Sequence, residues 1–409
     1  MARLLSSPPK LPTFATRRQF SACAAASDHR TDAVPPLLSL EIIGASKSLL
    51  TRFASLQQPY RPFPVLAWNC HVETIFAALF RSLPDVSLRR ECLRTEDGGA
   101  VALDWVSGDV ARLRPDSPTL ILLPGLTGGS DDTYVRHMLV RASKKGWRVV
   151  VFNSRGCGHS PVTTPQFYSA SFTKDLSQVV KYVKSCFPES NLYAIGWSLG
   201  ANILIQYLAQ ESHNCVLSGA VSLCNPFNLV IADDDFRKGF NIIYDRALAG
   251  ALRRIFKKHA LLFEDIGGDY NIPLAANAKS VRDFDDGLTR VSFGFKSVDD
   301  YYTNSSSSNS IKEVQIPLLC IQASNDPIAP SRGIPREEIR DNPNVLLIVT
   351  PKGGHLGWIA GEEAPFGAPW TDPVVMDFLE LLEKEKQDTF QKQLDCAQQS
   401  MDKLHELKV

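Results

Sequence analysis

Three features of the 409-residue sequence predict an α/β fold with a mostly parallel, doubly wound sheet and an inserted helical cap. Short apolar runs alternate with helical patterns from about residue 90 onward. Most of these runs are nearly continuous in Val, Ile and Leu, as strands buried on both faces require. The alternation breaks over residues 225–310, where amphipathic helical segments predict a cap over the strand ends.

The elements of this fold follow in chain order. Residues 92–106 predict a hairpin that turns at Asp97, because Asp-Gly-Gly separates two β-like runs. Buried strands are expected over 119–125, 148–153, 191–196, 217–224, 316–323 and 344–350, and connecting helices over 133–146, 171–186 and the segment after residue 198. A last helical pattern begins at Pro373 and continues as a polar segment to Val409.

These elements define the organisation that we expect. The segments are a leader (1–34), an N-terminal arm (35–89), the first part of the core (90–224), the helical cap (225–310), the second part of the core (311–387) and a polar C-terminal helix or tail (388–409). An α/β core of this length is typical of one catalytic domain.

Composition excludes several classes of function. The 44 basic and 44 acidic residues cancel, so the chain lacks the basic surplus of a nucleic-acid-binding protein and fits a small-molecule substrate better. The nine cysteines are scattered, without spacing typical of a metal site, which indicates a reducing compartment. No run reaches the roughly 18 apolar residues of a membrane span. We expect neither a metal nor an organic cofactor; the oligomeric state stays open.

The first 27 residues differ from the rest because they contain no Asp or Glu, while Arg and Lys stand among Ser, Ala and Pro. This composition is typical of a transit peptide. Pro8, Pro9 and Pro12 disfavour an amphipathic helix and therefore favour a plastid signal over a mitochondrial one. The run Arg18-Gln-Phe-Ser nevertheless resembles a mitochondrial processing site. We therefore predict the plastid, with the mitochondrion or an untargeted, cytoplasmic chain as alternatives.

Ser198 is the candidate nucleophile. It stands in Gly-Trp-Ser-Leu-Gly, directly after the apolar run 191–196 and before a helical pattern. A G-x-S-x-G sequence between a strand and a helix is typical of a strained turn that exposes the serine hydroxyl. A serine needs a neighbouring base to become nucleophilic, so the rest of a catalytic triad is expected elsewhere in the chain.

A tetrahedral intermediate would need backbone N–H donors for its oxyanion. The residue after the nucleophile, Leu199, is expected to supply one from the start of its helix. The Gly-rich loop after the run 119–125 is expected to supply the other, with Leu126 as the predicted donor and Thr127 as its neighbouring alternative.

The acid and base are expected after the nucleophile, in that order. Asp326 follows the run 316–323 and His355 follows the run 344–350, so both lie at carboxyl ends of expected parallel strands, where active sites of such sheets gather. His355 is flanked by glycines. We predict Ser198, Asp326 and His355 as the triad. His71 and His159 stand in other polar motifs and are candidates for a supporting or substrate-binding role.

The motifs resemble one group of α/β-hydrolases, which contains plant embryogenesis-associated proteins, bacterial YheT-like hydrolases, and yeast and animal medium-chain esterases and phospholipases. The resemblance is carried by NCHVETIF, LPGLTGGSDDTYVRH, NSRGCGHSPVTTPQFYSA, GWSLGAN, SNDPIAP and GGHLGW, over roughly residues 60–380. It implies the same triad and a carboxylic ester or lipid ester substrate. Two departures are a transit-like leader in place of an N-terminal span, and Pro124-Gly where the oxyanion loop usually has His-Gly.

We therefore expect a serine carboxylesterase or acylglycerol-lipase type of hydrolase, acting on acyl esters such as monoacylglycerols. A lipid acyltransferase is one alternative, although no histidine is followed five positions later by Asp. A binding protein that has lost catalysis is the other. Residues 247–263 also carry an apolar stripe with interleaved Arg and Lys, which predicts either a cap helix packed on the core or a lid that contacts anionic lipid.

Overall fold

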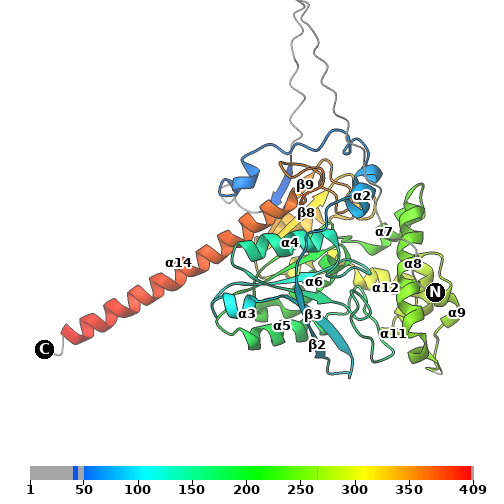
Figure 1. Ribbon diagram of the computed structural model, residues 1–409, viewed down its shortest axis with the longest axis horizontal. Helices are drawn as coiled ribbons and strands as arrows, with labels where there is room; N and C mark the ends of the chain where they lie inside the picture. Colours follow the sequence, from blue (N-terminus) through cyan, green and yellow to red (C-terminus); the bar gives the residue numbers. More distant parts are fainter. Residues whose placement is uncertain (1–39, 45–49, 265, 407–409) are drawn as a thin grey trace, which may run out of the picture. The chain divides into compact units, whose positions relative to one another are not determined.

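A nine-stranded sheet forms the centre of the computed structural model, which describes residues 40–44, 50–264 and 266–406 (Figure 1). The strands are β1 (Glu41–Gly44), β2 (Leu88–Arg94), β3 (Ala100–Val106), β4 (Thr119–Leu123), β5 (Arg148–Asn153), β6 (Leu192–Trp197), β7 (Leu217–Leu223), β8 (Leu318–Ala323) and β9 (Val345–Thr350). Their order is β1-β9-β8-β7-β6-β4-β5-β3-β2. The predicted leader lies outside the described residues.

The middle of the sheet is parallel, as the sequence predicts. Strands β4 to β9 pair in parallel, and all six predicted buried strands are confirmed. The predicted hairpin is confirmed too, because β2 and β3 pair antiparallel on either side of the turn at Asp97. Since the parallel strands point the same way, their carboxyl ends gather the loops that follow them at one edge.

The edge strand β1 is an element that the sequence analysis did not predict. Glu41–Gly44 pairs antiparallel with β9, within the segment expected to be an N-terminal arm. This strand has four residues and only two of them, Ile42 and Ile43, are strongly apolar. Its strand conformation depends on the edge of β9, which supplies the hydrogen bonds, and not on a pattern of its own.

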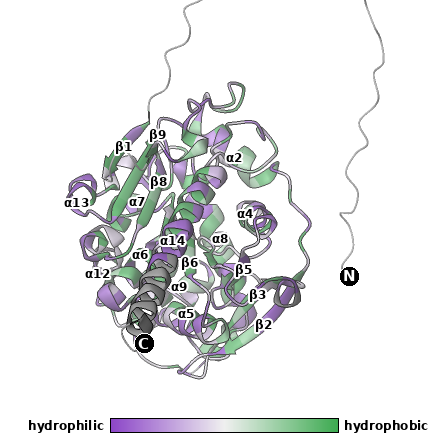
Figure 2. Cartoon of the chain, turned by 90° about the vertical axis from the view of Figure 1, so that its left-hand side faces the viewer, coloured by the Kyte–Doolittle hydropathy of each residue, from purple (hydrophilic) through white to green (hydrophobic). Residues whose placement is uncertain are grey.

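Helices cover both faces of the sheet. On one face, α4 (Thr133–Lys144) and the first turns of α14 (Thr371–Glu406) pack against side chains such as Leu120 and Leu122. On the other, α5 (Lys174–Cys186), α6 (Leu199–Glu211) and α13 (Arg336–Asp341) pack against Ile121 and Leu123. Successive side chains of β4 therefore point to opposite faces of the sheet, as they do in any β-strand. Figure 2 shows the apolar colouring along β8 and β9.

Shorter elements complete the core and its N-terminal segment. These are α2 (Cys70–Leu79), α3 (Asp109–Arg112), η1 (Ala54–Leu56), η2 (Ser212–Asn214) and η7 (Ser331–Gly333). None of the described helices has the length and apolar character needed to cross a bilayer.

The segment between β7 and β8 is mainly helical and includes the cap. Its elements are α7 (Leu229–Phe236), α8 (Asn241–His259), η3 (Ala260–Phe263), α9 (Ile272–Ala276), α10 (Val281–Phe284), the π-helix η4 (Asp285–Thr289), α11 (Arg290–Ser292), α12 (Val298–Ser305), η5 (Ser307–Asn309) and η6 (Ile311–Glu313). The apolar stripe of α8 faces inward: Leu252 and Phe256 are buried in a cluster of the cap, and Ile255 packs against it. The stripe is therefore the packed face of a cap helix, which is one of the two expectations for this segment.

Candidate active site

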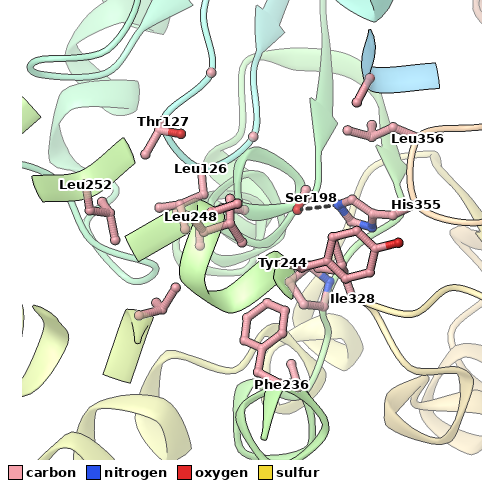
Figure 3. Close-up of a pocket in the computed structure, with 18 of the residues that line it drawn as sticks. Leu126, Thr127, Ser198, Phe236, Tyr244, Leu248, Leu252, Ile328, His355 and Leu356 are labelled. Atoms are coloured by element: carbon pink, nitrogen blue, oxygen red, sulfur yellow. Dashed lines mark hydrogen bonds between the residues drawn. The ribbon is translucent and has the colours of Figure 1, made fainter. Parts of the chain in front are cut away.

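Ser198 lies in a strained turn between β6 and α6. Its φ of 52° and ψ of −120° are sparsely populated for a residue with a Cβ, and such a conformation costs on the order of 1–3 kcal/mol. The surrounding structure holds it in place, because the Ser198 N–H donates to the Leu223 carbonyl oxygen on β7. The turn directs the hydroxyl into a cavity at the carboxyl edge of the sheet (Figure 3).

The glycines on either side of Ser198 are required by close backbone contacts. A Cβ on Gly200 would stand 2.2 Å from the Leu123 carbonyl oxygen and 2.5 Å from that of Pro124. A Cβ on Gly196 would stand 2.6 Å from the Cα of Ala201. Both distances are far below van der Waals contact, so the G-x-S-x-G pattern allows β6, α6 and the loop after β4 to meet at the serine.

The three residues predicted as a triad come together. His355 Nε2 lies 3.1 Å from Ser198 Oγ (Figure 3), and His355 Nδ1 lies 2.9 Å from Asp326 Oδ2 and 3.1 Å from Oδ1. His355 and Asp326 are each 6% exposed. The histidine therefore bridges the hydroxyl and the carboxylate within hydrogen-bonding distance on both sides.

Backbone donors orient Asp326. Its Oδ1 accepts the N–H groups of Ile328 and Ala329, each at 2.8 Å, in the turn that follows β8. These bonds fix the oxygens that face the imidazole. A carboxylate at Nδ1 favours the tautomer that leaves Nε2 free to accept a proton from Ser198.

The N-terminal segment holds the loop that carries His355, a role that the sequence analysis did not predict. The Thr74 hydroxyl on α2 accepts the His355 N–H at 2.9 Å. The buried Arg81 guanidinium donates to the carbonyl oxygens of Leu356 (2.8 Å) and Gly357. The loop needs this support because Leu356 has a φ of 62°, in the left-handed region. The polar residues within NCHVETIF are the sequence signal that could have indicated this role.

Two tyrosines fix the loop predicted to donate to an oxyanion. The Gly125 N–H donates to the Tyr134 hydroxyl at 3.0 Å, and the Thr127 N–H donates to the Tyr168 hydroxyl at 2.8 Å. The Thr127 N–H is thus already hydrogen-bonded, which favours Leu126 over Thr127 as the donor. The Leu126 N–H makes no hydrogen bond to the described part of the chain. Leu199 is the first residue of α6, where the N–H has no partner within the helix.

A cavity of about 720 Å³ extends from Ser198 between the core and the cap. Its walls are mostly apolar and come from α2, the loop after β4, α7 and α8; they include Leu126, Leu199, Phe236, Ile243, Tyr244, Leu248, Leu252 and Ile255. Figure 3 shows Leu126, Leu248 and Tyr244 around the serine hydroxyl. The volume is typical of a small-molecule pocket and suits an extended apolar group.

One wall of the cavity carries a buried carboxyl group. Asp285 lies in the π-helix η4, is 8% exposed, and accepts a hydrogen bond from the Tyr302 hydroxyl at 2.9 Å. Burial, with a smaller effect of the neighbouring Asp233 and Asp245, raises the pKa of Asp285 to about 7, although hydrogen bonds from Thr289 and Tyr302 oppose the shift. Near neutral pH this carboxyl therefore exchanges between its neutral and charged forms.

The two histidines proposed for supporting roles lie elsewhere. The Nδ1 atom of His71 lies 3.1 Å from the Tyr244 hydroxyl, and its ring packs on Phe240 at 4.5 Å, so His71 joins α2 to the cap. His159 is exposed. Neither lines the cavity. Among the described residues, no group of three or more His, Cys, Asp or Glu side chains could hold a metal ion.

Comparisons with known proteins place this geometry in a family. A family model described as the alpha/beta hydrolase fold matches residues 118–361. The chain is 68% identical over 354 residues to embryogenesis-associated protein EMB8 of Picea glauca, covering 85% of this chain and 77% of that protein. The chain belongs to the α/β-hydrolase family. This α/β-hydrolase is also 35% identical over 301 residues to phospholipase ABHD3 of Mus musculus (73% of this chain, 72% of that protein).

A third relative is the monoacylglycerol lipase of Saccharomyces cerevisiae, with 34% identity over 292 residues (69% of this chain, 63% of that protein). The resemblance found in the sequence motifs is thereby confirmed, and so is the predicted fold class. The family and these relatives indicate an enzyme that hydrolyses esters.

The buried carboxyl in the cavity wall leads to a prediction about stability. Because the folded-state pKa of Asp285 lies above its ordinary value of 3.8, the folded protein binds the proton more tightly than the unfolded chain. The contribution of Asp285 to stability is therefore full below about pH 4 and is lost as pH rises toward 7. Asp285→Asn should flatten this part of the dependence in urea unfolding between pH 5 and 8.

Asp286→Asn is the matched control, because the neighbouring Asp286 side chain is 47% exposed and pairs with Arg290. It should leave the slope of stability against pH nearly unchanged. Equal slopes for Asp285→Asn and the parent protein would contradict the raised pKa.

Proposed function

We propose that this α/β-hydrolase is a serine carboxylic ester hydrolase in which Ser198, His355 and Asp326 form the catalytic triad. The observation that carries the proposal is the pair of contacts made by His355, at 3.1 Å to Ser198 Oγ and 2.9 Å to Asp326 Oδ2. A nucleophile, a base and an orienting acid within hydrogen-bonding distance are the minimum that acyl transfer to a serine requires.

In the proposed mechanism, His355 Nε2 takes the Ser198 proton while Oγ attacks the ester carbonyl carbon. The N–H groups of Leu126 and Leu199 stabilise the negative charge on the carbonyl oxygen. The tetrahedral intermediate collapses as His355 returns the proton to the leaving alcohol, which leaves an acyl group on Ser198. Water, deprotonated by His355, then attacks the acyl-enzyme and releases the acid. No step calls on a metal or an organic cofactor.

The proposed substrate is an acyl ester with a substantial apolar part, such as a monoacylglycerol or another lipid ester. The volume of the cavity and its mostly apolar lining support an acyl chain as the bound group. The names of the two animal and yeast relatives, a phospholipase and a monoacylglycerol lipase, support the same class. The plastid stays the compartment predicted from the leader.

Substituting the proposed nucleophile tests the enzyme hypothesis. Ser198→Ala should lower kcat/KM for a p-nitrophenyl ester by about ten-thousandfold or more, because the covalent step is removed. It should also abolish labelling by a fluorophosphonate probe. Ser222→Ala is the control: Ser222 is a buried serine on β7, and its substitution should leave labelling intact. Equal labelling of the parent and Ser198→Ala would contradict the proposed triad. A parent protein that is labelled but does not hydrolyse the ester would favour acyl transfer.

The cavity wall yields a second prediction, about acyl length. Leu248 on α8 lines the cavity near Ser198 (Figure 3), so Leu248→Trp should fill space that a long chain uses. Across a series of p-nitrophenyl esters, kcat/KM should fall about tenfold or more for long acyl groups and change little for acetate. Leu261→Trp, at a cap residue that is 78% exposed and outside the lining, is the control. A uniform loss across the series would place the acyl group elsewhere.

A further inference from the structure

Six exposed apolar side chains lie on α2 or next to its ends, at the start of α8 and in the loop before α14, and two of them line the cavity. We call this set the apolar rim; it consists of Trp68, Leu79, Phe80, Phe240, Ile243 and Phe366, which are between 42% and 72% exposed. Large apolar patches on the surface of a folded protein mark sites of interaction, because exposing them to water is unfavourable. Single exposed apolar residues would need no such explanation.

Ring contacts join some of the rim residues across elements. The Phe76 ring on α2 lies 5.5 Å from the rings of both Phe80 and Phe366. On the same helix, the His71 ring lies 4.5 Å from the Phe240 ring, which joins α2 to the start of α8. These ring contacts connect the N-terminal segment, the cap and the loop before α14.

The rim is continuous with the cavity that contains Ser198. Leu79 is 72% exposed and Ile243 is 52% exposed, yet both also line the cavity. At these two residues, the exposed apolar surface and the apolar wall of the cavity are therefore continuous. A molecule that reaches Ser198 along this path crosses the rim.

A basic helix face begins at the rim. Arg246, Arg254, Lys257 and Lys258 follow Ile243 along α8 at helical spacing, so all lie on the face opposite the buried Leu252. All four are exposed, and none forms an ion pair within the described residues. Unpaired cations beside an apolar surface are complementary to a layer of anionic headgroups over acyl chains.

We propose that the apolar rim and the basic face of α8 bind the surface of an anionic lipid bilayer, with the cavity mouth held against the lipid. As an account of how substrate reaches Ser198, the proposal rests on the proposed ester hydrolase. A second copy of the chain fits this surface less well, because a twofold contact over the rim would bring the two basic faces near each other. The inward stripe of α8 takes no part.

The test measures binding to vesicles by flotation, using the full chain with Ser198→Ala so that lipid is not consumed. Vesicles of phosphatidylcholine alone are compared with vesicles that also contain phosphatidylglycerol. Binding should be stronger to the anionic vesicles, and Lys257→Glu/Lys258→Glu should weaken it about tenfold or more. Trp68→Ala/Phe80→Ala, which removes two rim side chains outside the cavity lining, should weaken binding to both vesicle types.

A matched control carries the same two Lys→Glu changes on α5 instead of α8. Lys174→Glu/Lys181→Glu reverses the charge of two exposed lysines on α5 that form no ion pair with described residues. It changes the net charge of the protein by the same amount as the α8 variant. This variant should bind nearly as well as the parent. In the active protein, the rim and α8 variants should hydrolyse a soluble p-nitrophenyl ester at the parent rate but a vesicle-embedded ester more slowly.

Each outcome decides the proposal. Equal loss of binding for the α5 and α8 variants would overturn it, as would the absence of vesicle binding by the parent. A rim variant that changes the sedimentation coefficient without changing vesicle binding would assign the rim to a second copy. Because binding is measured without the nucleophile, failure of the ester-hydrolase proposal would leave these results interpretable.

Discussion

The strained backbone at Ser198 is the constraint on which the site depends. A φ of 52° at a residue with a Cβ is unfavourable, and it persists because a buried strand enters the turn and a buried helix leaves it. Gly200 allows α6 to approach the end of β4, and Gly196 allows β6 to approach the first turn of α6, within distances that no side chain permits. The same approach places the backbone of Gly125 beside Ser198, because a Cβ on Gly125 would stand 3.2 Å from the Ser198 Cβ. The turn thus links the core to the chemistry that we propose.

The base is held from a different part of the chain. His355 stands on a loop whose backbone bends through the left-handed region, and α2 together with Arg81 hydrogen-bonds that loop at three points. The N-terminal segment also supplies β1 to the sheet edge and half of the apolar rim, namely Trp68, Leu79 and Phe80. It therefore connects the position of His355 with the surface that we propose to meet lipid. A change in α2 would act on both.

Much of the fold and the gathering of the triad residues could be predicted from the sequence, because their signals are local. Runs of Val, Ile and Leu indicate buried strands, and the G-x-S-x-G pattern carries its own turn geometry. Asp326 and His355 followed from the rule that loops at the carboxyl ends of parallel strands meet. By contrast, β1, Thr74, Tyr134 and Tyr168 act through contacts with residues far along the chain. Their own sequence neighbourhoods hold no signal for such contacts, and the same is true of the direction in which the α8 stripe faces.

The central claim is that Ser198 becomes acylated during turnover. It is tested most directly by mixing the parent protein with a p-nitrophenyl ester, quenching within the first turnovers, and locating the added mass by peptide mapping. The account predicts one acyl group on the peptide that contains Ser198, formed together with a burst of p-nitrophenol. An acyl group on another residue, or steady turnover with no adduct on this peptide and no burst under conditions where deacylation is slowed, would contradict it.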